Sequence, residues 1–128
     1  MGKIELTGKV FSGQGGGKKF LELPWVRQQI QQKLGFTPYP GTLNLKLSPQ
    51  SAQSRRMIEK KAVLKICPQK NYCEGTLIKA FVGAHECAVV IPKVENYPRD
   101  ILELVASFSL REELQLRDGD TVTVTIDL

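Results

Sequence analysis

Short runs of alternating apolar and polar residues recur along the whole chain, and no other feature limits its fold as much. A period of two is typical of strands that bury one face. We predict six such strands, at residues 3–11, 42–47, 62–67, 75–82, 85–91 and 122–126. Several connections are too short for the crossovers that parallel strands need, which argues against a doubly wound sheet. The pattern predicts a mainly β fold, a compact barrel with a few inserted helices, in a single domain that spans residues 1–128.

Three segments carry helix signals. Residues 24–34 begin with a proline, have apolar residues at helical spacing and are followed by Gly35, a residue typical of the left-handed cap. Residues 98–106 also begin with a proline, and an apolar stripe predicts a second helix there. Residues 109–112 form a capping box that begins a third, short helix. The polar and basic segment 48–60 is predicted to be a loop or a short surface helix with a solvated face.

The chain is basic, because 18 Lys and Arg residues outnumber 13 Asp and Glu residues and give a net charge of +5. This charge favours an anionic partner such as a nucleotide, a phosphate ester or a nucleic acid. No apolar run is long enough to cross a bilayer, and residues 1–8 lack the apolar stretch of a secretory signal. We therefore expect a cytoplasmic protein that does not contact a membrane.

The three cysteines, Cys67, Cys73 and Cys87, are an odd number, which fits a reducing compartment better than a disulfide framework. Together with His85 they could form a Cys3His zinc site, but their spacing lacks the Cys-x-x-Cys pairs of zinc modules. We therefore interpret them as packed or partly exposed thiols.

The first candidate binding segment is rich in glycine. Four glycines, at positions 13 and 15–17, precede Lys18 and Lys19. Glycine loses much backbone entropy on ordering and packs no side chain, so we predict a loop over residues 12–17. Its N–H groups can approach phosphate oxygens, and the lysines add positive charge. A flexible surface turn is an equally good interpretation of the composition alone.

The second candidate lies on the predicted strand at residues 42–47. Thr42 and Asn44 are two residues apart, so their side chains project from the same face and offer two neutral oxygens. Hard divalent cations accept such oxygens when substrate phosphates and water complete the coordination shell. An exposed strand face, whose hydroxyl and amide contact only water, is the alternative interpretation.

The third candidate is the predicted helix start at residues 108–112. Free N–H groups lie there beside Arg111, whose guanidinium can hold an anionic or planar group. The capping box alone, however, also explains two of these residues. Two acidic residues upstream, Glu95 and Glu103, would ordinarily be solvated carboxylates.

Taken in order, these motifs resemble the CTP-dependent riboflavin kinases of archaea. The similar segments are GKVFSGQGGGKKF at residues 8–20, GFTPYPGTLNL at 35–45, VVIPK at 89–93, SLRE at 109–112 and LRDGDTV at 116–122. They fall in the order of the family and span nearly the whole chain. The combination of PYPGTLNL with a preceding glycine segment is the most specific part of the resemblance.

The resemblance implies a six-stranded cradle-loop (RIFT-like) β-barrel that binds CTP and riboflavin side by side and makes FMN and CDP. The family's nucleotide contacts fall on Gly13, Gln14, Gly15, Gly16, Gly17, Lys18, Phe108, Ser109, Leu110 and Arg111. Its Mg²⁺ ligands fall on Thr42 and Asn44, and its flavin contacts fall on Glu95 and Glu103. At the position of Glu95 the family pattern has a small hydroxyl residue instead.

The resemblance also implies a mechanism, in which the riboflavin 5′-hydroxyl attacks the γ-phosphorus of CTP and Glu103 either orients that hydroxyl or accepts its proton. We expect a monomer that consists of the barrel alone, without the winged-helix domain of some relatives, and that binds no nucleic acid. Two other hypotheses stay open. One is a DNA-binding barrel module, since LRDGDTV also resembles swapped-hairpin transcription factors, and the other is a nucleotide-binding protein without activity.

Overall fold

The computed structural model describes residues 3–13, 16–62, 64–69 and 74–127. Its strands are β1 (Lys3–Phe11), β2 (Leu43–Leu47), β3 (Leu64–Ile66), β4 (Gly75–Val82), β5 (His85–Pro92), β6 (Ile101–Val105) and β7 (Thr121–Asp127). Its helices are α1 (Gly16–Glu22), α2 (Pro24–Leu34), α3 (Pro49–Lys61) and α4 (Leu110–Glu113). Within the described residues, none of these helices has the length and apolar composition of a membrane span.

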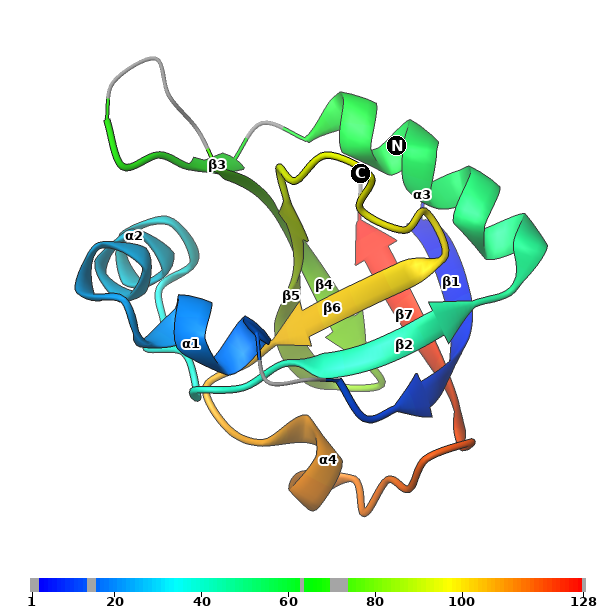
Figure 1. The fold of residues 1–128 in the computed structure, drawn as a ribbon. Coiled ribbons are helices and arrows are strands. Elements are labelled where there is room, and N and C mark those ends of the chain that lie inside the picture. Colours follow the sequence, from blue (N-terminus) through cyan, green and yellow to red (C-terminus); the bar gives the residue numbers. More distant parts are fainter. Residues whose placement is uncertain (1–2, 14–15, 63, 70–73, 128) are drawn as a thin grey trace.

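Six of the strands form a closed antiparallel barrel (Figure 1). The order around the barrel is β4-β5-β6-β2-β1-β7, and β7 pairs with β4 to complete the circle. This last contact consists of two residue pairs, Ala80 with Ile126 and Phe81 with Thr125. The short strand β3 extends the sheet beside β4. The arrangement confirms the predicted six-stranded barrel.

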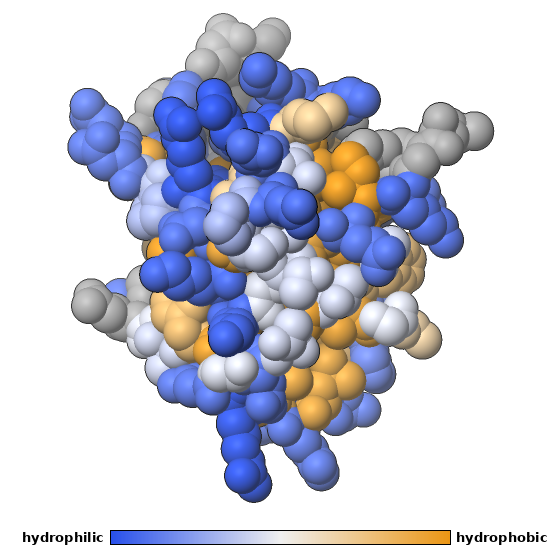
Figure 2. Space-filling model, turned by 90° about the vertical axis from the view of Figure 1, so that its right-hand side faces the viewer, coloured by the Kyte–Doolittle hydropathy of each residue, from blue (hydrophilic) through white to orange (hydrophobic). Residues whose placement is uncertain are grey.

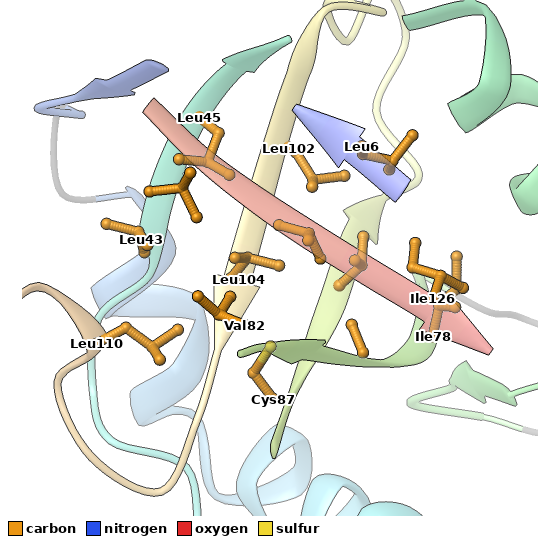
Figure 3. Packing of buried hydrophobic residues seen from close by; sticks show 14 of the residues in the cluster. Leu6, Leu43, Leu45, Ile78, Val82, Cys87, Leu102, Leu104, Leu110 and Ile126 are labelled. Atoms are coloured by element: carbon orange, nitrogen blue, oxygen red, sulfur yellow. The ribbon is translucent and has the colours of Figure 1, made fainter. Parts of the chain in front are cut away.

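Aliphatic side chains fill the interior of the barrel (Figure 3). Because successive strand residues point to opposite faces, every second residue of a strand can be buried there. Leu45 of β2 and Leu102 and Leu104 of β6 are no more than 1% exposed. The helices α3 and α4 lie at opposite ends of the barrel in Figure 1, and each adds a residue to this core, Ile58 and Leu110 respectively.

A second apolar layer lies outside the barrel, beneath α1 and α2. Leu21, Val26 and Ile30 of these helices pack in one cluster with Leu77 of β4 and Val90 of β5. Strands β4 and β5 are therefore buried on both faces over much of their length, which explains their long apolar sequences. The side of the molecule with α3 and β1 is mostly hydrophilic, interrupted by patches of apolar residues (Figure 2).

The prediction of a helix over residues 98–106 is wrong. This segment contains strand β6, which pairs with β2 on one side and with β5 on the other. Its sequence, Ile-Leu-Glu-Leu-Val, is compatible with both a helical and a strand period. As a helix it would leave the facing edges of β2 and β5 without hydrogen-bond partners, and the barrel would stay open.

The other predicted helices form. Helix α2 covers residues 24–34, and Gly35 ends it in the left-handed conformation, with a φ of +84°. The basic segment 48–60 is helical as α3. One of its arginines, Arg55, is only 5% exposed, so the prediction of a solvated face is wrong at that residue.

The glycine segment is only partly the predicted loop. Gly16 and Gly17 belong to the first turn of α1, whereas positions 14 and 15 lie outside the described residues. A helical glycine costs about 0.5–1 kcal/mol. Burying Leu21 of the same helix contributes about 1.5–3 kcal/mol. The tertiary contact therefore offsets the poor helix propensity of this sequence.

The cysteines are not the three free thiols that the sequence predicts. Cys67 is disulfide-bonded, and Cys73 lies outside the described residues. Cys87 is a free thiol in the barrel core, where burial and the nearby charge of Glu86 raise its pKa to about 12.

Among the residues that the structure describes, no group of His, Cys, Asp and Glu side chains is arranged to hold a metal ion by itself.

Candidate active site

A cavity of about 540 Å³ lies between α1 and the strands β2, β5 and β6. Its polar lining consists of Gly13, Lys18, Thr42, Asn44, Tyr97 and Glu103. Its apolar lining includes Phe11, Phe20, Leu21, Val90, Pro92 and Ile101. The volume is typical of a small-molecule site, in which a few polar groups converge within an apolar wall. The fold thus brings predicted site residues from three distant parts of the sequence into one cavity.

The register of the barrel places the polar groups of β2 and β6 together. Asn44 lies opposite Glu103 in the pairing of these strands, and both point away from the leucine-filled interior. The Thr42 hydroxyl lies 2.9 Å from Asn44 Oδ1 and 3.2 Å from Glu103 Oε1. A hydroxyl has one proton, so Thr42 can donate to only one of these two oxygens at a time.

These oxygens fit the ligand preference of a hard divalent cation. Thr42 Oγ1 and Asn44 Oδ1 are neutral oxygens 2.9 Å apart, and Glu103 Oε1 lies 3.2 Å from the first of them. A magnesium ion usually takes one or two protein ligands and completes its shell with water and substrate phosphates. The donor set therefore fits Mg²⁺ that arrives with a phosphorylated substrate, rather than a permanently bound ion.

The start of the glycine segment lies directly against Asn44. A Cβ atom added at Gly13 would stand 2.2 Å from Asn44 Nδ2, closer than real Cβ contacts allow. Only a glycine at this position leaves the Asn44 amide where it is. Gln14 and Gly15 lie outside the described residues, and Lys18 lines the same cavity from α1.

Tyr97 is a site residue that the sequence did not reveal. Its hydroxyl donates a hydrogen bond of 2.5 Å to Glu103 Oε2. Burial, this hydrogen bond and the charge of Glu103 all raise the Tyr97 pKa far above its usual range, so the phenol stays protonated and remains a donor. Tyr97 lies in the loop between β5 and β6, and no local pattern predicts its contact with a residue on β6.

The other predicted nucleotide-binding segment lines a neighbouring cavity. Residues 108–111 and Tyr39 surround a space of about 120 Å³, which shares Gly41 and Thr42 with the larger cavity. Ser109 caps α4 as predicted, and its hydroxyl accepts a hydrogen bond from the third N–H that follows it. The two nucleotide-binding segments of the sequence prediction are therefore adjacent in space.

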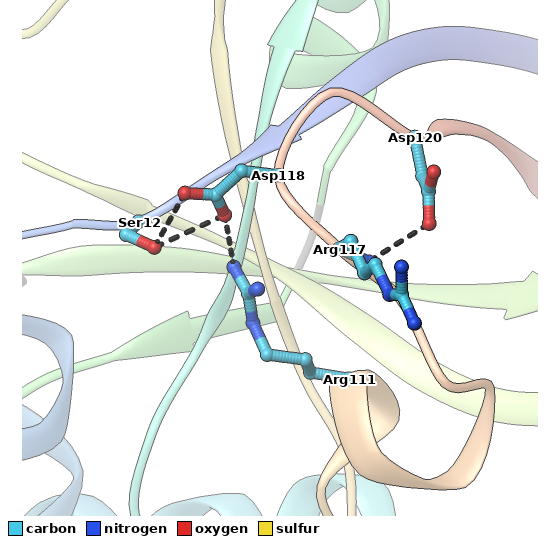
Figure 4. Close-up of polar contacts among 5 residues, drawn as sticks. All are labelled: Ser12, Arg111, Arg117, Asp118 and Asp120. Atoms are coloured by element: carbon cyan, nitrogen blue, oxygen red, sulfur yellow. Dashed lines mark hydrogen bonds and ion pairs between the residues drawn. The ribbon is translucent and has the colours of Figure 1, made fainter.

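An ion pair joins α4 to the turn before β7, and a hydrogen bond from Ser12 joins this turn to the segment after β1 (Figure 4). Arg111 Nη2 lies 2.8 Å from Asp118 Oδ1, and the same carboxylate accepts hydrogen bonds of 2.9 and 3.0 Å from the Ser12 hydroxyl. Arg111 and Ser12 thereby lower the Asp118 pKa below its model-compound value of 3.8. The contact fixes the guanidinium of Arg111 beside the smaller cavity.

Replacing Asp118 with asparagine should cause a small, pH-dependent loss of stability. Because the folded-state pKa of Asp118 is lowered, its charge stabilises the fold above about pH 3.8, and this contribution disappears as the pH falls through the folded pKa. The melting temperature of Asp118→Asn should therefore lie slightly below that of the wild type at pH 7. In strong acid the two melting temperatures should become equal. Thermal unfolding between pH 2 and pH 7 measures the difference. An equal difference at every pH would contradict the ion-pair explanation.

Glu95 is not brought into the main cavity. It lines a separate groove of about 1030 Å³ together with the basic residues Arg55, Arg56, Lys93 and others. The groove adjoins the cavity through Pro92, Val94 and Tyr97, which line both. Glu95 is exposed there, while Glu103 faces Thr42, so the two predicted flavin contacts lie in different places.

Comparisons with known proteins give the family of the chain. The chain is 36% identical over 127 residues to the riboflavin kinase of Methanosarcina barkeri, and 38% identical over 131 residues to that of Archaeoglobus fulgidus. It is 42% identical over 129 residues to the riboflavin kinase of Pyrobaculum islandicum.

These alignments cover 96%, 99% and 98% of the chain and 56%, 56% and 61% of the respective relatives. The chain thus spans less than two thirds of the length of these relatives. A family model with the name CTP-dep_RFKase, described as domain of unknown function DUF120, matches residues 10–126. The chain therefore belongs to the family of CTP-dependent riboflavin kinases.

Proposed function

We propose that this chain transfers the γ-phosphoryl group of CTP to the 5′-hydroxyl of riboflavin and so produces FMN and CDP. The observation that carries the proposal is the single cavity lined by Gly13, Lys18, Thr42, Asn44 and Glu103. Phosphate-binding, cation-binding and proton-accepting groups face one another there. Phosphoryl transfer needs little covalent chemistry from the protein, but it does need this kind of alignment.

The apolar wall of the cavity supports a flavin substrate. Five of its lining residues, Phe11, Phe20, Val90, Pro92 and Ile101, are apolar. An extended aromatic ring system such as isoalloxazine gains free energy from burial against such a wall. The polar ribityl chain would then extend toward Thr42 and Glu103, where a terminal hydroxyl is needed.

The phosphate end of the nucleotide is assigned to the glycine segment. Lys18 supplies a positive charge at the cavity, and Arg111 supplies another at the adjoining smaller cavity. Because the two cavities share Gly41 and Thr42, one triphosphate can span both. Thr42 and Asn44 would hold Mg²⁺, which when bound neutralises charge on the phosphate oxygens.

We assign Glu103 to a position beside the hydroxyl of riboflavin that reacts. Tyr97 occupies its Oε2, so Oε1 is the oxygen that can turn from Thr42 to the riboflavin 5′-hydroxyl. A carboxylate held in this way can orient the hydroxyl and accept its proton as the phosphoryl group is transferred.

The proposal is tested by incubating the protein with riboflavin, Mg²⁺ and each of the four common nucleoside triphosphates in turn. FMN is then separated from riboflavin by chromatography. We expect FMN with CTP and little with the purine nucleotides. Failure of all four triphosphates to yield FMN would contradict the assignment as a kinase.

Replacing Gly13 with alanine should lower kcat about tenfold, because the new methyl group displaces the Asn44 amide from the metal and phosphate position. Steady-state FMN formation measures the change. The matched control introduces Gly13→Ala into an Asn44→Ala background, where no amide remains to be displaced. The extra methyl group should then have almost no further effect, and a full tenfold loss in both backgrounds would refute the explanation.

A further inference from the structure

Arg55 on α3 is a buried charge without a carboxylate partner. It is 5% exposed, and no acidic group among the described residues forms an ion pair with it. Its Nη1 donates a hydrogen bond of 2.9 Å to the Pro98 carbonyl, and its buried Nε has no partner. The desolvation of a buried arginine costs roughly several kcal/mol of folding free energy unless other contacts compensate for it. The cost indicates that the position serves something other than stability.

The guanidinium of Arg55 contacts the aromatic ring of Tyr97. Its central carbon lies 5.4 Å from the ring centroid, which is a cation–π distance. On the other side, the Tyr97 hydroxyl donates the 2.5 Å hydrogen bond to Glu103 Oε2. A continuous set of contacts therefore runs from the outer helix α3 through Tyr97 to Glu103 in the cavity.

The loop that carries Tyr97 is anchored at its two ends, where the Lys93 N–H donates to the Glu74 carbonyl at 2.7 Å and the Asp100 carbonyl accepts from the Leu47 N–H at 2.6 Å. Between β5 and β6, its backbone makes a turn in which the Tyr97 N–H donates to the Val94 carbonyl at 3.2 Å. Asn96 adopts the left-handed conformation, with a φ of +64°, which asparagine tolerates better than most residues other than glycine. Arg55 holds this loop at two points, the Tyr97 ring and the Pro98 carbonyl, and so fixes the direction of the phenol hydroxyl.

We propose that Arg55 is a positioning residue for phosphoryl transfer, which acts through Tyr97 to keep the Glu103 carboxylate turned toward the reacting hydroxyl. The inference rests on the function proposed above. Arg55 does not itself line the main cavity, and it contacts the cavity lining through Tyr97. Its effect should therefore appear in the rate of the bound complex and not in the binding of riboflavin or CTP.

The test compares Arg55→Gln with Arg56→Gln. The two variants lose the same charge from the same helix and the same groove, but Arg56 is exposed and contacts neither Tyr97 nor Pro98. Arg55→Gln should lower kcat about tenfold and leave both KM values within about twofold, as expected for loss of a desolvated cation–π contact. Arg56→Gln should behave like the wild type. Equal losses in both variants, or a change confined to KM, would refute the proposal.

A double-mutant cycle with Tyr97→Phe separates positioning from general destabilisation. Phenylalanine keeps the ring against Arg55 but no longer holds Glu103, so Arg55→Gln should cost little more in that background. If the fall in kcat of the double variant equals the product of the falls in the two single variants, the proposed route through Tyr97 is contradicted. If Arg55→Gln does not fold, Arg55→Lys takes its place, since lysine keeps the charge but not the planar guanidinium. A wild type that makes no FMN would instead refute the kinase assignment, and so the two failures are distinguishable.

Discussion

Replacing both Thr42 and Asn44 with alanine should lower kcat for FMN formation by about 10²-fold or more and leave the barrel folded. Asn44 lies on β2 and Thr42 directly precedes this strand; both line the cavity, and neither contributes to the apolar core. The Thr42 hydroxyl lies within hydrogen-bond distance of both Asn44 Oδ1 and Glu103 Oε1, so the two neutral oxygens lie beside the carboxylate. Without them, charge that develops on the transferred phosphoryl group loses its stabilisation in the transition state.

The measurement is steady-state FMN formation over a range of Mg²⁺ concentrations. Lys46→Ala on the same strand is the matched control, because its charged end is solvent-exposed and lies outside the cavity. The double variant should also need more Mg²⁺ to reach its reduced maximal rate. Undiminished activity in the double variant would remove the basis of the metal assignment.

Replacing Leu102 with alanine should lower the free energy of unfolding by about 2–5 kcal/mol. Leu102 of β6 is 1% exposed and packs inside the barrel beside Leu45 of β2 (Figure 3). Removing three carbon atoms from a closed barrel leaves a cavity that the hydrogen-bonded wall cannot easily fill. Chemical denaturation, followed by far-ultraviolet circular dichroism, gives the change.

Met57→Ala on α3 is the control for this core substitution. Met57 is 58% exposed, so shortening it should change the free energy of unfolding by about 0.5 kcal/mol or less. A small effect at both positions would contradict the burial of Leu102 in the barrel core.

Most of the strands could be predicted because their signals are local. The hairpin of β4 and β5 has apolar runs on both sides of Gly83, whose φ is +60°, and β7 alternates strictly after the turn at Gly119. Strand β6 could not be predicted, since Ile-Leu-Glu-Leu-Val satisfies two periods equally well. The choice between them is made by the free edges of β2 and β5, which come from elsewhere in the chain.

The candidate site, too, could be predicted from the sequence only in part. The common face of Thr42 and Asn44 follows from the period of a strand, and it is present in the structure. The position of Glu103 beside them follows from the register between β2 and β6, which no local pattern reveals. Arg55 and Tyr97 were missed because their contacts join a helix, a loop and a strand that are far apart in the sequence.

The pairing of β7 with both β1 and β4 has a consequence for biosynthesis. Because β7 is translated after every other strand, the nascent chain holds β1 and β4 with unsatisfied edges until residues 121–127 leave the ribosome. Such edges can recruit strands from other polypeptides, which exposes the unfinished chain to misassembly. The circle can therefore close only after β7 has emerged, and until then the edges of β1 and β4 stay open to misassembly.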